Sequence, residues 1–331
     1  MRAVQAVEFG GPEVLRLREV PDPVPGPGEV LIEVGAADVM FLDARLRSGW
    51  GTDYFKVEPP YVPGGAVAGV ITAVGPEVAE SWLGKRVGAQ TAASGVGGGL
   101  PIGGYAELAL AKVDTVTEVP EALSLTQAVA LTHDGRTTLA LLDQVALRPG
   151  EWVLITAAGG GLGTLLTQFA RAAGAHVIAA ARGSAKLELA ARLGAEVVVD
   201  YSEPGWVEKV RAAASGGGVD AVLDGAGGEL GTAAAEALAD GGRFFGYGSA
   251  AGDFPDLDRA ALVERGIDVR GLFDVTGPDT DWAALAARAA NAVAAGEVEV
   301  VIGQTFPLEN ASDAHAAIES RAAIGRTLLT M

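Results

Sequence analysis

The stretch that decides the fold is Trp152-Val-Leu-Ile-Thr-Ala-Ala-Gly-Gly-Gly-Leu-Gly-Thr-Leu-Leu166. An apolar run leads into a cluster of glycines, and the glycines lead directly into an amphipathic segment. This order predicts a buried strand, a tight turn and a helix that begins near Leu162. Such a turn exposes backbone N–H groups at the positive end of the helix, where a pyrophosphate can bind. The stretch therefore favours a dinucleotide-binding unit over an ordinary glycine-rich turn.

The residues that follow repeat the order of strand and then helix. We expect strands at 176–181, 196–200, 219–224, 243–247 and 267–273, and helices at 185–193, 207–214 and 229–238. Strands that alternate with helices of this length predict right-handed crossovers and a doubly wound parallel sheet. Before the series, helical spacing predicts a helix at 123–144, with Ser124 as its N-cap.

The residues on either side of this series form a second domain. Residues 1–120 contain short apolar or alternating segments that are separated by Gly and Pro clusters, which is typical of strands. The segment after Gly277 is too short to fold alone, so we expect it to complete the N-terminal domain. The predicted fold is α/β, with a β-rich domain at 1–122 that 269–331 completes, and a dinucleotide-binding domain at 123–268.

Composition and charge exclude several classes of protein. The formal net charge of −18 repels phosphate backbones, so we expect no nucleic-acid partner. The chain has no cysteine, which excludes disulfides, thiolate nucleophiles and cysteine-based zinc sites. No stretch approaches the apolar length of a membrane span, and the N-terminus lacks the apolar core of a signal peptide. We therefore expect a cytoplasmic protein without a membrane partner.

The end of the second expected strand predicts which dinucleotide binds. An NAD-binding protein usually carries an acidic residue there, which grips the ribose 2′-hydroxyl. Here Arg182, Ser184 and Lys186 follow the strand instead. A hydroxyl and two cations attract a 2′-phosphate, so these residues favour NADPH. The alternative is that Lys186 belongs only to the solvated face of a helix.

Five segments in the same order along the chain resemble the zinc-independent quinone oxidoreductase (zeta-crystallin-like) branch of the medium-chain dehydrogenase/reductase superfamily. They are VPGGAVAGVITAVG at 62–75, GGYAE at 103–107, AAGGGLG at 157–163, GAEVVVDY at 194–201 and ESRAAIGRTLL at 319–329. The resemblance covers essentially the whole chain. It implies a GroES-like catalytic domain, a Rossmann domain, and reduction of quinones or α,β-unsaturated carbonyls by NADPH.

The resemblance also implies a set of cofactor contacts. The family's nucleotide-loop residues fall on Ala157, Gly160 and Gly163. Its 2′-phosphate ligands fall on Lys186, Tyr201 and Arg321. Its nicotinamide contact falls on Thr137. Taken singly, Tyr201 could instead be an ordinary aromatic at the end of a strand, and Arg321 a solvated helix terminus.

The positions of the catalytic zinc ligands in metal-dependent relatives are altered. They fall on Met40, Gly65 and His133, of which only His133 can coordinate a metal. A catalytic zinc site needs three protein ligands and an open position. The lobe that carries four cysteines in those relatives is replaced by a short glycine-rich segment at 92–104. We therefore expect no metal.

Without a metal, a hydrogen-bond donor must stabilise the oxygen that gains charge when hydride is added to an electrophile. The candidate catalytic residues are Tyr54 and His133, with Asp134 beside the histidine as its possible orienting group. Tyr105 and Arg45 are further candidates. A structural role for His133 remains the alternative.

Two alternatives to a quinone or enone reductase stay open. One is an enoyl-thioester reductase, and the other is a non-catalytic NADPH-binding protein. The second stays open because Met40 and Arg45 replace the asparagine and tyrosine that are usual in the zinc-independent relatives. We also expect a homodimer, since the apolar strand at 267–273 could pair across a two-fold axis.

Overall fold

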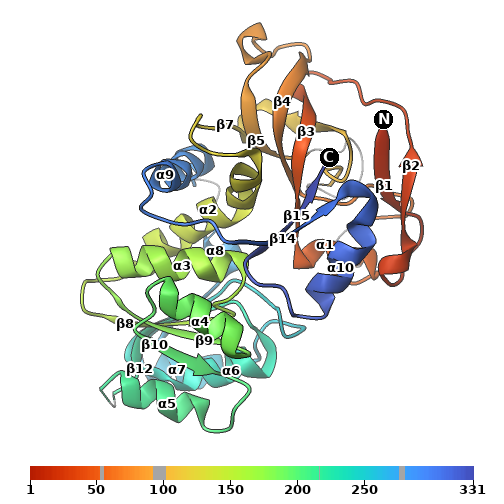
Figure 1. Cartoon of the computed structure of the whole chain (residues 1–331). Helices are drawn as coiled ribbons and strands as arrows, with labels where there is room; N and C mark the ends of the chain where they lie inside the picture. Colours follow the sequence, from red (N-terminus) through yellow and green to blue (C-terminus); the bar gives the residue numbers. More distant parts are fainter. Residues whose placement is uncertain (53–55, 92–101, 216, 276–279) are drawn as a thin grey trace. The chain divides into compact units, whose positions relative to one another are not determined.

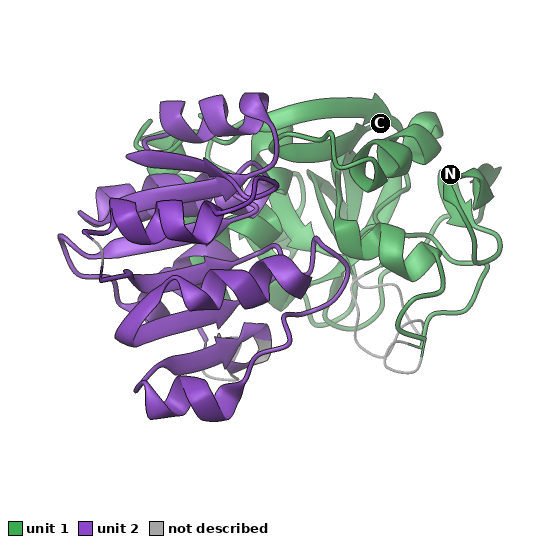
Figure 2. Cartoon of the chain, turned by 90° about the horizontal axis from the view of Figure 1, so that it is seen from below, with its two compact units in different colours: residues 1–136, 282–331 green, residues 137–281 purple. Residues whose placement is uncertain are grey.

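The computed structural model describes residues 1–52, 56–91, 102–215, 217–275 and 280–331 (Figure 1). The chain forms two compact units, which are coloured separately in Figure 2. Unit 1 contains Met1–Arg136 and Trp282–Met331, and unit 2 contains Thr137–Asp281. The last fifty residues thus belong to the same unit as the N-terminal part.

The unit boundaries differ from 122/123 and 268/269, where we placed the domain boundaries from the sequence. The N-terminal part of helix α2, Leu125–Val145, belongs to unit 1 because Ala128, Val129 and Ala130 pack in one apolar cluster with strand residues of that unit. Residues 268–271 form a strand of the unit 2 sheet, so unit 2 extends past 268.

Unit 1 is built on a seven-stranded sheet in the order β14-β15-β3-β4-β5-β7, with β6 paired to β3, and on the hairpin β1-β2. Its strands are β1 Arg2–Ala6, β2 Leu15–Glu19, β3 Glu29–Val39, β4 Ala66–Val74, β5 Arg86–Gln90, β6 Leu108–Lys112, β7 Val116–Glu118, β14 Ile302–Pro307 and β15 Arg326–Thr330. Besides the start of α2, its α-helices are α1 Phe41–Arg47, α9 Trp282–Ala294 and α10 Ala311–Glu319.

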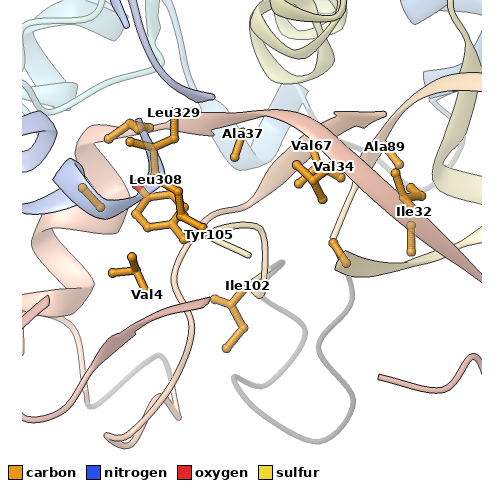
Figure 3. Packing of buried hydrophobic residues seen from close by; sticks show 14 of the residues in the cluster. Val4, Ile32, Val34, Ala37, Val67, Ala89, Ile102, Tyr105, Leu308 and Leu329 are labelled. Carbon is orange, nitrogen blue, oxygen red and sulfur yellow. The ribbon is translucent and has the colours of Figure 1, made fainter. Parts of the chain in front are cut away.

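The core of unit 1 joins the two ends of the chain. Val4, Ile32, Tyr105 and Leu329 all belong to one buried cluster (Figure 3). The register of β15 against β3 places Leu328 opposite Asp38 and Thr327 opposite Val39. The returning C-terminal strand therefore carries its first residues to the end of β3, which matters for the site described below.

Unit 2 is a six-stranded, wholly parallel sheet in the order β10-β9-β8-β11-β12-β13. This confirms the predicted doubly wound sheet. Its strands are β8 Trp152–Thr156, β9 His176–Ala181, β10 Val197–Asp200, β11 Val219–Asp224, β12 Leu238–Gly246 and β13 Asp268–Gly271. Its helices are the rest of α2, α3 Gly161–Ala172, α4 Ser184–Arg192, α5 Trp206–Ala213, α6 Gly228–Glu236, α7 Arg259–Glu264 and α8 Leu272–Val275.

The local predictions differ from the structure mainly at element ends. Ser124 caps α2 as predicted, because its Oγ accepts a hydrogen bond from Gln127 N at 3.1 Å. The strand expected at 267–273 is shorter, since β13 ends at Gly271 and the chain turns into α8. Gly271 N donates there to Asp274 Oδ2 at 2.7 Å, which a continued strand would not allow.

Candidate active site

The glycine loop between β8 and α3 is held by backbone contacts. Ala157 has a φ of +51°, in the left-handed region, and its carbonyl oxygen accepts a hydrogen bond from Gly160 N at 3.0 Å. A Cβ on Gly163 would lie 2.6 Å from Ala157 O and 2.7 Å from Ala158 Cα. Since backbone atoms cannot move aside like a flexible side chain, this close packing of helix and strand requires glycine at position 163.

The start of α3 is suited to an anion. Its N-cap is Gly160, which has no side chain with which to accept a hydrogen bond from the first-turn N–H groups. Those groups carry the positive end of the helix dipole. Ala157, Gly160 and Gly163 are thus brought together as a cradle of backbone amides that fits a pyrophosphate.

A buried carboxylate fixes the ends of the two central strands next to this cradle. Thr156 Oγ1, at the end of β8, donates to Asp224 Oδ1, at the end of β11, at 2.5 Å. Gly225 N and Ala226 N donate to the same threonine oxygen at 3.0 and 3.1 Å, and Gly227 N donates to Asp224 Oδ2 at 3.1 Å. Burial raises the pKa of Asp224. This pair is not among the residues predicted from the sequence, although a polar residue at the end of each strand is its visible sign.

The basic residues expected at the 2′-phosphate lie where β9 meets α4. Arg182 and Ser184 are exposed, and Ser184 is the first residue of α4. Lys186 is half-buried and lies over the glycine loop, because a Cβ on Gly159 would meet the Cβ and Cγ atoms of Lys186 at 2.7 Å. The structure therefore joins Lys186 to the phosphate cradle, a contact that the sequence spacing did not show.

An acidic side chain also lies near this junction, although none follows β9 in sequence. Asp200, at the end of β10, accepts hydrogen bonds from Gly183 N at 2.9 Å and from Ser202 Oγ at 2.5 Å. The bond from Ser202 and the bond from Gly183 hold the pKa of Asp200 below its ordinary value. Tyr201 follows it, half-buried, with its ring edge-on to Trp206. Asp200 thus serves to hold the β9–α4 turn in place.

The remaining predicted cofactor residues are placed as follows. Thr137 is half-buried on α2 and is the first residue of unit 2. Arg321 belongs to unit 1, where it is exposed just after α10 with a φ of +59°. Tyr54 lies outside the described residues.

His133 is bound to a carboxylate from another part of the chain. On α2, its Nδ1 lies 3.3 Å from Asp38 Oδ2, at the end of β3. Arg326, from β15, donates to the same carboxylate oxygen, and its Nη1 lies 3.4 Å from Asp134 Oδ2. The orienting residue of His133 is therefore Asp38. The expectation that Asp134 would orient it is wrong, because Asp134 pairs with Arg326.

The charges in this cluster are set by burial and by Arg326. Burial opposes the ionisation of Asp38, but Arg326 and His133 together hold the pKa of Asp38 below its ordinary value. Burial raises the pKa of Asp134 to about 6 and lowers the pKa of His133. At neutral pH the carboxylate of Asp38 is ionised and the imidazole of His133 is uncharged.

Tyr105 is not available to a substrate. It is fully buried, and its hydroxyl lies 2.9 Å from His315 Nε2 and 3.3 Å from Asp43 Oδ2. Burial raises the pKa of Asp43 to about 7 and lowers that of His315 to about 3. The expectation that Tyr105 could donate to a substrate oxygen is therefore wrong, since this side chain links α1 to α10 inside the core.

The positions that correspond to zinc ligands hold no group of donors. Among the described residues, no cluster of three or more His, Cys, Asp or Glu side chains could bind a metal ion. Met40 forms the N-cap of α1, and its N–H donates to Asp43 Oδ2 at 2.8 Å. Arg45, which replaces the family's usual tyrosine, stacks on Trp50 at 4.5 Å.

Comparison with known proteins places the chain in a family. Residues 26–121 match the family model of the alcohol dehydrogenase GroES-like domain, and residues 161–291 match that of the zinc-binding dehydrogenases. The quinone oxidoreductase of Sus scrofa is 33% identical over 100% of this chain and 98% of its own length. The chain belongs to the quinone oxidoreductase branch of the medium-chain dehydrogenase/reductase superfamily.

Three other relatives are informative about a substrate or a cofactor. A 2-haloacrylate reductase from Burkholderia is 33% identical over 97% of this chain and 96% of its own. The structure of Escherichia coli quinone oxidoreductase, solved with NADPH, has a TM-score of 0.90 and 28% identity, with both chains fully covered. A mycobacterial protein complexed with NADPH has a TM-score of 0.89 and 32% identity, again with both chains fully covered.

One further property of the chain concerns membranes. In the described ranges, no helix combines the length and the apolar character that a membrane span requires.

Proposed function

We propose that the protein is an NADPH-dependent oxidoreductase that transfers hydride to a quinone or an α,β-unsaturated carbonyl compound without a metal. The observation that carries the proposal is the backbone cradle at the start of α3, with Lys186 packed against Gly159. Two solved relatives bind NADPH, and the curated relatives reduce quinones or a haloacrylate.

The cofactor contacts divide between backbone and side chains. The amides of the loop formed by Ala157, Gly160 and Gly163 would hold the pyrophosphate. The 2′-phosphate would be bound by Arg182, Ser184, Lys186, Tyr201 and Arg321, and the nicotinamide would contact Thr137. The bound cofactor supplies the hydride, and the protein supplies its position and the surrounding charges.

The substrate contacts are fewer. We propose that Tyr54 donates a hydrogen bond to the substrate oxygen on which charge develops. His133 would contact the same oxygen, as a donor when its ring is protonated. Because Met40 and Gly65 cannot act as ligands, this stabilisation would come from side chains without zinc. The haloacrylate reductase among the relatives supports a conjugated carbonyl as one class of substrate.

Steady-state turnover tests the proposal. NADPH oxidation would be followed with quinones, enals, enones and enoyl thioesters, with NADH in parallel and with and without a chelator. We expect turnover of quinones or enones with NADPH in preference to NADH, at a rate that the chelator does not change. Tight NADPH binding without turnover of any compound would instead indicate a binding protein. Preference for enoyl thioesters would indicate the alternative reductase class.

We also propose a cytoplasmic homodimer that has a small molecule as its substrate and has no nucleic-acid or membrane partner. Strand β13 ends the unit 2 sheet, and among the described residues it pairs with β12 alone, which leaves its second edge for a symmetry-related copy. A pocket lined by Val269 and Arg270 of β13 also includes Phe254, which is 50% exposed. Light scattering at micromolar concentration should give twice the chain mass of 33.4 kDa, and the mass of a monomer would contradict the proposal.

A further inference from the structure

The two ring nitrogens of His133 have different surroundings. Nδ1 faces the buried carboxylate of Asp38 at 3.3 Å. Nε2 makes no hydrogen bond to any described residue, and it is not one of the fully buried polar atoms that lack a partner. The side chain is 15% exposed. One nitrogen of the ring is therefore directed inward to a carboxylate, and the other reaches the surface of unit 1.

The carboxylate decides which nitrogen carries the proton. Asp38 has no exposed surface and its Oδ2 also accepts from Arg326, which favours the ionised form. An ionised carboxylate can only accept, so Nδ1 of the uncharged imidazole must donate its N–H to Asp38. Nε2 is then left with a bare lone pair. At neutral pH, His133 thus presents a proton acceptor to the surface, whereas the sequence predicts a donor at this position.

The other two histidines of the chain lack this arrangement. His315 is fully buried, with Nε2 bound to Tyr105 and Nδ1 enclosed. His176 is 43% exposed on unit 2, and its Nδ1 pairs with an exposed carboxylate, Glu196. Only His133 combines a buried, arginine-bound carboxylate on one nitrogen with an accessible second nitrogen, as a general base requires.

His133 lies one helical turn before Thr137 on α2, so both side chains project from the same face of that helix. This step rests on the proposed function, in which Thr137 contacts the nicotinamide. In that proposal, the accepting nitrogen lies on the same face of the helix as the residue that contacts the nicotinamide.

We propose that the Asp38–His133 pair is a general base that allows this protein to oxidise alcohols with NADP⁺ and without a metal. The alcohol O–H bond breaks and its proton passes to His133 Nε2. The carbinol C–H bond breaks and its hydrogen leaves with the electron pair to the oxidised nicotinamide. The alcohol loses two electrons and becomes a carbonyl, the cofactor gains them, and the imidazolium returns its proton to water. Asp38 acts as a positioning residue, and Arg326 keeps it ionised.

The pH dependence follows from the groups around His133. Burial is the largest influence, and it lowers the pKa of the imidazole. Asp38 on β3 raises this pKa, whereas Arg136 on α2 and Arg326 on β15 lower it, so the net shift is downward. The base is present above the pKa of His133, so alcohol oxidation should increase as pH rises through that value. Carbonyl reduction, which needs the protonated ring, should decrease over the same range.

The test compares the wild type with His133→Asn and His176→Asn. An asparagine at 133 places an amide N–H where Nδ1 stands, so it keeps a donor to Asp38 and removes only Nε2. His176→Asn changes a histidine remote in sequence and is the matched control. NADP⁺ reduction would be measured with primary, secondary and allylic alcohols in the presence of a chelator, and NADPH-dependent quinone reduction with the same preparations.

We expect alcohol oxidation by the wild type and by His176→Asn, and a decrease of about 10²- to 10⁴-fold in kcat for His133→Asn. The melting temperature of His133→Asn and its affinity for NADPH should be close to those of the wild type. A second readout needs no turnover: ¹⁵N NMR of the cofactor-free protein should show the Nδ1–H tautomer for His133, assigned by its loss in His133→Asn.

Three results would overturn the inference. They are quinone reduction without any alcohol oxidation, alcohol oxidation that His133→Asn leaves unchanged, and an Nε2–H tautomer for His133. If NADPH is neither bound nor oxidised, the proposed function fails as well, and the first assay on the wild type distinguishes that case.

Discussion

The two candidate sites of the molecule are built by different means. In unit 2 the phosphate cradle comes from a contiguous segment, Ala157–Gly163, and consists almost wholly of backbone atoms. In unit 1 the His133 site consists of ionisable side chains. Asp38 lies 95 residues before His133 and 288 residues before Arg326. The backbone site should therefore depend on the size of side chains, whereas the side-chain site should depend on their charge.

The largest effect on stability is expected from Asp38→Ala. Removing this carboxylate leaves the guanidinium of Arg326, which is 13% exposed, with the more distant Asp134 as its one remaining ion-pair partner among the described residues. Breaking a buried pair at one end typically lowers the free energy of unfolding by about 3–5 kcal/mol. Asp240→Ala removes an exposed partner of Arg265 and should change the free energy of unfolding by less than about 1 kcal/mol. Equal losses for both variants, measured by urea denaturation, would show that the buried cluster contributes no more than a surface pair.

Gly163→Val tests whether the backbone site depends on the size of its side chains. The added side chain meets Ala157 O and Ala158 Cα within 2.7 Å, so the loop must move. Overpacking of this kind lowers the free energy of unfolding by about 1–3 kcal/mol, and the displaced amides should weaken NADPH binding by about tenfold or more. Gly217, where an added Cβ meets nothing within 4 Å, gives the matched control Gly217→Ala. Unchanged NADPH binding by Gly163→Val would argue against a backbone cradle.

The smallest effect concerns the pH dependence that Asp43 imposes on unit 1. Its folded pKa of about 7 lies above the ordinary value of 3.8, so the native state binds more protons than the unfolded state between these values. Stability must then fall as pH rises through this window. Relative to Asp43→Asn, which remains uncharged, the wild type should lose about 2 kcal/mol between pH 5 and 7. A constant difference between the two proteins across this range would contradict the raised pKa.

The same contrast explains how much could be predicted from the sequence. The parallel sheet, the glycine loop and the cap at Ser124 depend on residues that are neighbours in sequence, and their periodicity and spacing are visible there. Contacts that fold the chain back are not visible. The β3–β15 register that brings Arg326 to Asp38, and the packing of Lys186 on Gly159, depend on how distant segments pair.

The errors have the same physical origin. Asp134 was chosen as the partner of His133 because it is the next residue, but successive residues on a helix do not face each other. Tyr105 is expected from the sequence to be a donor near the cleft, but its hydroxyl is enclosed between Asp43 and His315. In both cases the actual partner comes from another element. Arg326 of β15 pairs with Asp134, and His315 of α10 contacts the Tyr105 hydroxyl.

The cofactor site is tested by calorimetric titration of NADPH and NADH into the wild type and into Lys186→Glu. Lys209→Glu, at an exposed lysine that pairs with Glu203, is the control. We predict that the wild type binds NADPH more tightly than NADH. Lys186→Glu should lose about tenfold to a hundredfold in NADPH affinity with little change for NADH, since charge-assisted hydrogen bonds contribute about 1.5–3 kcal/mol. Equal affinity of the wild type for both dinucleotides, or a Lys186→Glu variant that behaves like Lys209→Glu, would contradict the cofactor site described here.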